Sequence, residues 1–84
     1  MKHHANARFW AAYDALPRKV QMSADKSFDL LKSNPHHPSL NLKRVNRYWS
    51  ARIGLAHRAL AVRDGDDLIW FWIGEHGEYE SLIR

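Results

Sequence analysis

The cations of this chain are gathered in one segment, and phosphate is the chemistry that they favour. Between Leu30 and Arg63 there are seven basic residues and no acidic one, whereas from Asp64 onward six acidic residues accompany a single basic one. The seven are Lys32, Lys43, Arg44, Arg47, Arg52, Arg58 and Arg63. A segment charged so one-sidedly generates a positive field that attracts polyanions. The alternative is a solvated basic surface that binds nothing.

Length and composition limit what can position these cations. The chain has 84 residues, 45% of them apolar and 26% charged, so we expect one domain with one core spanning residues 1–84. Since there is no Cys, disulfides, thiolate metal sites and Cys nucleophiles are excluded. The longest apolar run, residues 68–73, is too short to span a bilayer, and no secretion signal is evident. We therefore expect a cytoplasmic protein without a membrane partner.

Apolar periodicity predicts two helices followed by strands. Helical spacing over residues 6–16 and 18–32 indicates a helical hairpin with a turn at Pro17. From Leu40 the period changes to two, which predicts short strands at 40–42, 48–53, 57–62 and 68–73. The tail, 78–83, fits one further helical turn. The expected fold is α+β: a two-helix hairpin packed on a twisted antiparallel sheet of three to four strands, with a short carboxy-terminal helical turn.

Hairpin register decides which cations share a face. A two-residue loop at Asn46-Arg47 pairs Val45 with Tyr48 and Lys43 with Ser50. A three-residue loop, Gly54-Leu55-Ala56, sets Arg52 opposite Arg58, whereas a two-residue loop at Leu55-Ala56 would place these two arginines on opposite faces; we expect the three-residue loop. Lys43, Arg52 and Arg58 then lie on one face. Pairing Arg63 with Asp66 places Ala61, Ala59 and His57 opposite Leu68, Trp70 and Trp72 on the face toward the helices.

The cationic face also carries apolar residues: Leu60, Ile69, Phe71 and Ile73. Cations on an apolar floor suit a phosphate backbone, with the aromatic and aliphatic groups left for bases. Alternatively, the carboxy-terminal turn or a bound protein covers that floor.

Several motifs resemble the RelE/ParE family of toxins from bacterial type II toxin-antitoxin systems. The most specific is Tyr48-Trp49-Ser50-Ala51-Arg52-Ile53 followed by His57-Arg58, and the similarity extends over His37-Pro38-Ser39-Leu40, Asp64-Gly65-Asp66 and Ile73–Tyr79 to the helical hairpin. The resemblance implies the same hairpin-on-sheet fold. Many members begin with a short strand, for which Met1–Ala5 is barely long enough, and some nucleases of the family have a catalytic Glu without a convincing counterpart here.

The resemblance also implies a function. Members of the RelE branch cut messenger RNA in the ribosomal A site without metal or cofactor, and members of the ParE branch poison DNA gyrase. Carried over by position, Lys43, Arg52 and Arg58 match the basic sheet positions, while His76 and Tyr79 match the terminal catalytic region. Together with Arg44 and Arg47, the three sheet cations are the expected RNA contacts.

The residue types fit metal-free RNA cleavage, in which the ribose 2′-OH attacks the adjacent phosphate. Such a reaction needs a base, an acid and cations for the developing charge. Arg52 and Arg58 would clamp the phosphate, and His76 is the best acid or base by type. Lys43 would assist as a cation or as a base, and Tyr79 would orient or stack on a nucleobase. A backbone-bonded His76 and a packing role for Tyr79 are the structural alternatives.

We therefore expect an endoribonuclease without cofactor or metal, acting on messenger RNA on the ribosome and neutralised by a cognate antitoxin. A gyrase inhibitor that acts by protein binding, or a member that only binds its antitoxin, is the alternative. Competing motifs are weak. Adjacent His36 and His37 rarely converge on one ion, residues 64–67 fit a hairpin turn better than a calcium loop, and Ser50 and His57 lack an Asp for a triad.

Overall fold

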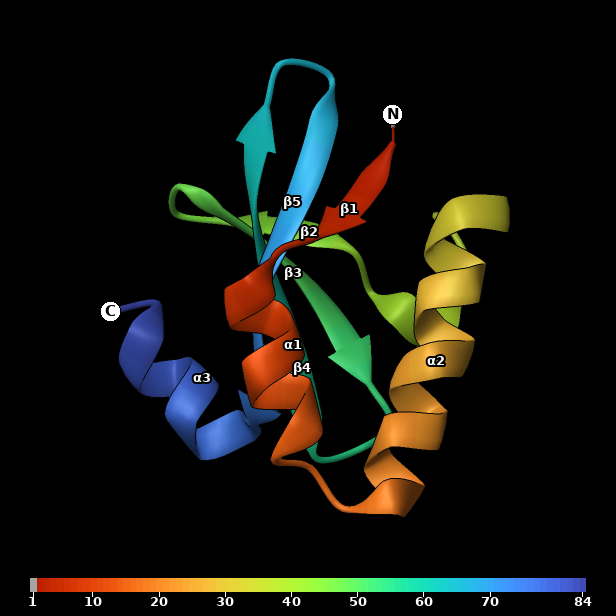
Figure 1. Cartoon of the computed structure of the whole chain (residues 1–84). Coiled ribbons are helices and arrows are strands. Elements are labelled where there is room, and N and C mark those ends of the chain that lie inside the picture. The colour runs from red at the N-terminus through yellow and green to blue at the C-terminus, as the bar shows by residue number, and fades with distance from the viewer. Residues whose placement is uncertain (1) are drawn as a thin grey trace.

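The computed structural model describes residues 2–84, which form three α-helices and a five-stranded mixed sheet. The strands are β1 (His3–Ala5), β2 (Lys43–Val45), β3 (Tyr48–Ile53), β4 (His57–Asp64) and β5 (Asp67–Glu75). The helices are α1 (Ala7–Asp14), α2 (Arg18–Ser33) and α3 (His76–Leu82). The strand order is β1-β5-β4-β3-β2, and in Figure 1 α1 lies in front of the sheet, with α2 to the right and α3 to the left. The predicted α+β class is confirmed.

The helical hairpin forms where the periodicity predicts it. Asn6 caps α1, because its side-chain oxygen accepts a hydrogen bond from the amide of Phe9 at 3.0 Å. Pro17 precedes α2 with a φ of −57°, which the pyrrolidine ring favours at the start of a helix. Both helices pack on one face of the sheet and form the core with it. The buried residues of this core are Phe9, Ala24, Leu31, Leu40, Ala51, Ile53, Ala59, Ala61, Leu68, Trp70 and Ile73.

The opposite face of the sheet is partly covered by α3. Leu60 is completely buried although it does not belong to that core, and Tyr79 of α3 is 5% exposed. Arg58, which alternates with core residue Ala59 along β4, lies over the Tyr79 ring at 6.0 Å from its centroid. The apolar floor predicted on this face is thus partly covered by the chain itself, as the alternative interpretation had it. None of the helices formed by residues 2–84 is long and apolar enough to cross a membrane.

The sheet has one strand more than the three or four predicted, and it is not wholly antiparallel. β1 pairs in parallel with β5, with His3 opposite Leu68 and Ala5 opposite Trp70. The indole Nε1 of Trp70 donates a hydrogen bond to His3 Nδ1 at 3.0 Å, and burial lowers the pKa of His3 from its ordinary value. A three-residue strand of His, His and Ala carries no apolar alternation, so periodicity alone misses it.

The strand predicted at residues 40–42 is also displaced. Pro38–Leu40 forms a 3-10 turn, and Asn41 follows with a φ of 44°, a left-handed conformation that Asn tolerates. β2 therefore begins only at Lys43, but its register against β3 is the predicted one, with Val45 opposite Tyr48.

The predicted register of the last hairpin is wrong. Asp64 pairs with Asp67 around Gly65, whose φ is 61°, so Ala61 lies opposite Trp70 rather than Leu68. This shift by two residues keeps the predicted faces. Farther along, however, a β-bulge adjacent to Leu60 and Ala61 adds one residue to β5 and exchanges its two faces. The list of pairs beyond the bulge is Leu60 with Trp72, Ala59 with Ile73 and Arg58 with Gly74. Ile73, expected on the cationic face, consequently lies in the core, whereas Trp72, expected on the helix face, shares the side of Leu60.

Candidate functional site

The three predicted sheet cations start from the same face of the sheet. Lys43 lies opposite Ser50 in the β2–β3 pair, and Arg52 lies opposite Arg58 in the β3–β4 pair. Ser50 and Arg52 alternate with Ala51 of the core, so all of these side chains leave the backbone away from α1 and α2. The predicted placement of Lys43, Arg52 and Arg58 on one face is therefore confirmed.

Arg58 is the cation that the fold holds most firmly. Its Nη1 donates to the backbone carbonyl of His57 at 2.9 Å, and its guanidinium lies 6.0 Å from the centroid of the Tyr79 ring. The side chain is half-buried. A guanidinium placed in this way keeps further donors for a phosphate while losing little side-chain freedom when it binds one.

His76 begins α3 beside this arginine. Its backbone amide donates to the carbonyl of Ala56 in the β3–β4 turn at 2.9 Å, and its ring centroid is 5.7 Å from that of Tyr79. The imidazole Nε2 lies 2.8 Å from Oε1 of Glu80, and the His76 side chain is 47% exposed. The ring is therefore both oriented by a carboxylate and accessible to a substrate.

Glu80 is a site residue that the sequence analysis missed. It is one helical turn beyond His76 in α3, and the available signal was this spacing of four residues between a histidine and a carboxylate. The predicted tail helix began only at residue 78, which left His76 outside it and concealed the relationship.

The ring of Tyr79 contacts both Arg58 and His76, so it is not free to stack on a nucleobase. At 5% exposure it packs α3 against the sheet, which agrees with the structural alternative for this residue. In this position the ring orients its two neighbours.

Lys43 and Arg52 do not join this cluster. Lys43 is exposed on the same face of the sheet, where its partner Ser50 lies two residues before Arg52 in β3. Arg52 is half-buried and is one of the residues that line a separate cavity between α2 and the β3–β4 turn. Arg52 and Arg58 are thus partners in the sheet, but within the described residues only Arg58 of the two contacts the ring of Tyr79.

The two remaining predicted RNA contacts lie at the β2–β3 turn. Arg44 is opposite Trp49, so it alternates with Lys43 onto the other face, and its Nε donates to the carbonyl of Asn46 at 3.2 Å. Arg47 is exposed and lies 5.7 Å above the Tyr48 ring. The side-chain amide of Asn46 donates to the carbonyl of Ile83, which ties this turn to the end of α3. Only Arg47 therefore adds an open cation next to the predicted face.

His37 and Asp67, which belong to the competing motifs, make hydrogen bonds within the protein. His37 Nδ1 accepts the amide of Ser39 at 3.2 Å and lies 2.8 Å from its hydroxyl, so His37 caps the 3-10 turn. Asp67 accepts the backbone amide of Lys2 at 3.1 Å, and this bond lowers the pKa of Asp67. Within residues 2–84, no three His, Asp or Glu side chains come close enough together to hold a metal ion.

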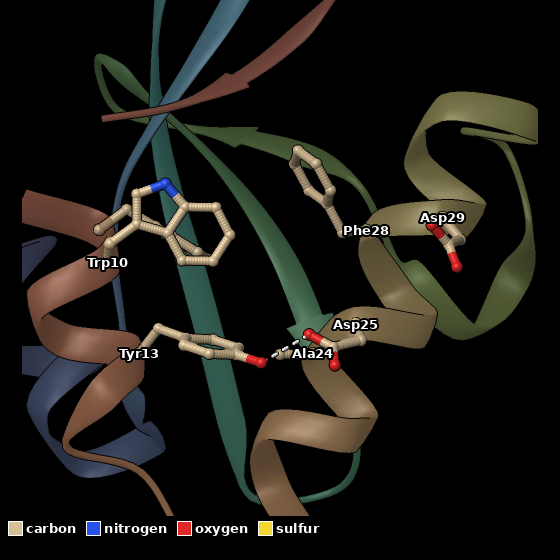
Figure 2. A pocket seen from close by; sticks show the side chains of 7 residues that line it. Trp10, Tyr13, Ala24, Asp25, Phe28 and Asp29 are labelled. Carbon is tan, nitrogen blue, oxygen red and sulfur yellow. Dashed lines mark hydrogen bonds between the residues drawn. The ribbon is translucent and has the colours of Figure 1, made fainter. Parts of the chain in front are cut away.

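A second cavity, of about 210 Å³, lies between α1 and α2 and is mainly aromatic. Figure 2 shows Trp10 and Tyr13 of α1 facing Phe28 of α2, with the Tyr13 hydroxyl donating to Asp25 at 2.8 Å. This hydrogen bond raises the pKa of Tyr13. No cation lines the cavity, so it does not suit phosphate chemistry.

Comparisons with known proteins agree with this fold. A family model described as a ParE-like toxin domain matches residues 18–81. A YoeB/ParE toxin from Agrobacterium tumefaciens is 19% identical and superposes with a TM-score of 0.67, covering 90% of this chain and 99% of that one. No curated protein matches the sequence.

Two further solved structures share the fold. RelE in the RelB-RelE antitoxin-toxin complex from Methanococcus jannaschii is similar with 14% identity and a TM-score of 0.69, covering 96% of this chain and 99% of that one. The isolated E. coli RelE toxin has 10% identity and a TM-score of 0.63, covering 96% and 94% of the two chains. With the family match spanning most of the chain, this protein belongs to the ParE-like toxin family, and it shares the fold of the YoeB/ParE and RelE structures.

Proposed function

We propose that this toxin is a metal-independent endoribonuclease that cleaves messenger RNA on the ribosome. The observation that carries the proposal is the contact of an accessible His76 with Glu80, beside Arg58 and at the end of a face that carries Lys43. This set supplies a proton acceptor, a group that orients it, and cations for a phosphate. RNA contains its own nucleophile, the 2′-OH, so the protein needs no further reactive group.

The contact with Glu80 assigns a role to each nitrogen of His76. Because a carboxylate only accepts hydrogen bonds, the neutral ring carries its proton on Nε2, toward Glu80. Nδ1 is then free to accept the proton of the 2′-OH. As the 2′-oxygen bonds to phosphorus, the bond to the 5′-oxygen breaks, and water protonates that oxygen. The products are a 2′,3′-cyclic phosphate and a 5′-hydroxyl.

The cations stabilise the charge that develops on the phosphate. Arg58 already donates one hydrogen bond to the protein and has other N–H groups available. Lys43 and Arg47 are exposed along the same side and would hold the flanking backbone, with Tyr79 keeping Arg58 and His76 in place. Arg44, which leaves β2 on the other face, has no role in this arrangement.

Purified toxin incubated with ribosomes and messenger RNA in excess EDTA tests the proposal. We expect discrete cleavage with cyclic-phosphate ends, and a loss of about 10²-fold or more in His76→Gln, the scale of general acid–base catalysis. His36→Gln is the matched control, because His36 is exposed in the loop after α2. Intact transcripts at stoichiometric toxin, or equal losses in the two variants, would contradict the proposal.

A gyrase inhibitor is the second candidate, because the matching family model is described as ParE-like. A toxin of this kind would act by binding protein, so His76→Gln would retain its effect on growth. Supercoiling by purified gyrase in the presence of the toxin separates the two: inhibition with intact messenger RNA identifies the second function.

A further inference from the structure

The cavity between α1 and α2 has aromatic walls and a floor in the core. Phe9 and Ala24, which are buried residues of the core, line it together with Trp10, Tyr13 and Phe28. Figure 2 shows the rings of Trp10 and Tyr13 from α1 and of Phe28 from α2 directed into the space between the helices. At about 210 Å³ the cavity is large enough for a small organic group, since apolar cavities of about 150 Å³ bind benzene.

The rings of α1 present both faces and edges to this space. The ring of Trp10 is nearly perpendicular to those of Phe9 and Tyr13, at interplanar angles of 88° and 79° and a centroid distance of 5.2 Å in each pair. An aromatic face carries partial negative charge and attracts cations. Phe28 already makes such a contact, because Lys32 Nζ lies 4.9 Å from its centroid. Lys32 itself does not line the cavity.

The charges on the lining are negative. Asp25 and Asp29 line the cavity, and no basic residue does. Figure 2 shows the Asp25 carboxylate directed toward Tyr13, whose hydroxyl donates to it at 2.8 Å. Among residues 2–84 Asp25 forms no ion pair, whereas Asp29 Oδ1 lies 3.9 Å from Lys32 Nζ. The charge of Asp25 is therefore not compensated by a cation of the described chain, and its carboxylate has lone pairs left to accept from a ligand.

We propose that this cavity binds an alkylammonium group, with the alkyl chain against Phe9, Ala24 and Phe28 and the ammonium beside Asp25. The aromatic faces and the carboxylate both attract such a cation. A hard metal ion needs several oxygen ligands, which aromatic side chains do not supply. A neutral apolar group would remove water from the Asp25 carboxylate without replacing its hydrogen bonds. The lining therefore favours an organic cation over both.

An amine site here is separate from the proposed reaction. The helices α1 and α2 pack on the core face of the sheet, whereas Arg58 leaves the opposite face toward Tyr79. None of the residues assigned to RNA cleavage lines the cavity. Amine binding is thus expected whether the toxin acts on messenger RNA or on gyrase. The ammonium group can belong to a free amine or to the lysine side chain of a bound protein, and the ligands below distinguish these sources.

Amide chemical-shift titrations of the ¹⁵N-labelled toxin test the site. The ligands are butylammonium, its neutral analogue n-butanol, and a capped lysine, Nα-acetyl-lysine methylamide. We expect saturable shifts at Trp10, Tyr13 and Ala24, with butylammonium binding at least about fivefold more tightly than n-butanol. Tighter binding of the capped lysine than of butylammonium assigns the site to a protein side chain, and weaker binding assigns it to a free amine.

Two variants test the charge of the site. Asp25→Asn keeps an oxygen that accepts from Tyr13 but removes the charge, so it should weaken butylammonium binding about threefold and leave n-butanol unchanged. Asp14→Asn is the matched control, since Asp14 is exposed at the end of α1 and does not line the cavity. Both aspartates are exposed, so both variants are expected to fold, and an unchanged spectrum in the rest of the protein verifies it.

A third variant tests the aromatic wall. Trp10→Leu keeps an apolar side chain at a residue that is 45% exposed, and it should weaken butylammonium binding more than n-butanol binding. Equal affinities for butylammonium and n-butanol in the wild type would overturn the proposal, because they would indicate a merely apolar groove. Equal weakening by Asp25→Asn and Asp14→Asn, or the absence of saturable shifts, would overturn it as well.

Discussion

His76 and Glu80 face each other across one turn of α3, with 2.8 Å between the imidazole Nε2 and the carboxylate Oε1. On the surface of a short helix, such a pair contributes little to stability. We infer that its main effect is on the tautomer and orientation of the imidazole, which connects the helix to the proposed chemistry.

We therefore expect Glu80→Gln to slow RNA cleavage by about tenfold, less than the roughly 10²–10⁴-fold that general acid–base catalysis contributes. Combined with His76→Gln, it should cause no further loss, because Glu80 acts through the histidine. Single-turnover cleavage rates measure both effects. Glu78→Gln is the control on the same helix, where Glu78 is exposed. Additive losses in the double variant would show that Glu80 acts independently.

Arg58→Ala should abolish toxicity and also cost about 1 kcal/mol of stability, because it removes a hydrogen bond to His57 and a contact with the Tyr79 ring. Sequence reasoning that treats Arg58 as exposed predicts a change within about 0.5 kcal/mol. Thermal unfolding distinguishes the two, since 1 kcal/mol corresponds to about 4–8 °C in a domain of this size. In the same strand, Arg63→Ala removes only solvent-exposed contacts with Gly65 and Asp66, which contribute little to stability, so this variant should melt close to the wild type.

Stability should fall as pH is lowered from about 7 toward 5. Burial lowers the pKa of His3 below its ordinary value of 6.5 in the folded state, so the unfolded chain takes up a proton first. The stabilising effect is complete above pH 6.5 and is lost as pH falls through the lowered pKa. His3→Gln should reduce this slope in urea unfolding, and His36→Gln should not. Asp67, whose pKa is also lowered, acts in the same direction but below about pH 4.

Two glycine substitutions should have different effects on stability. A Cβ on Gly74 would overlap the ring of Trp72, so Gly74→Ala must displace the indole and should cost about 1–3 kcal/mol. In Gly77→Ala the new methyl group meets nothing within 4 Å, and the helix should gain up to about 1 kcal/mol. Chemical denaturation measures both, and a shift in Trp fluorescence is expected for Gly74→Ala alone. Equal stabilities would show that the indole yields at no cost.

The cognate antitoxin should be acidic and amphipathic where it binds. Lys43 and Arg47 are exposed, and Val62 and Leu82 are 37% and 40% exposed, so charge and apolar surface both remain to be covered. Co-expression with the product of an adjacent small reading frame should restore growth. The complex should be stabilised by about 4 kcal/mol when the antitoxin is at a thousandfold excess over Kd. If no neighbouring reading frame encodes a product that binds the toxin, the prediction of this antitoxin is wrong.

The sequence predicts the helices and the first two hairpins well because their signals are local. Pro17 and the spacing around Phe9 define the helical hairpin, and short loops determine the register that brings Arg52 opposite Arg58. β1 is missed because its pairing with residues 68–70 is distant in sequence. The bulge in β5 has no signature in the apolar pattern, so the faces on which Trp72 and Ile73 lie are predicted wrongly.

The candidate site is predictable only as far as the backbone determines it. Register places Lys43, Arg52 and Arg58 on one face, but it does not reveal that Arg58 is the one that lies over the ring of Tyr79. The partnership of His76 with Glu80 depends on α3 beginning at His76, and helix ends are poorly determined by sequence.

The parallel pairing of β1 with β5 affects the order in which the protein can fold as it is synthesised. In each pair that joins β1 to β5, such as His3 with Leu68, the two residues are 65 positions apart in the sequence (68 − 3). Contacts so far apart in sequence form late and slowly. Until β5 has left the ribosome, the first strand lacks its partner and the sheet cannot be completed. A nascent toxin therefore remains incompletely folded until residues 68–70 have emerged.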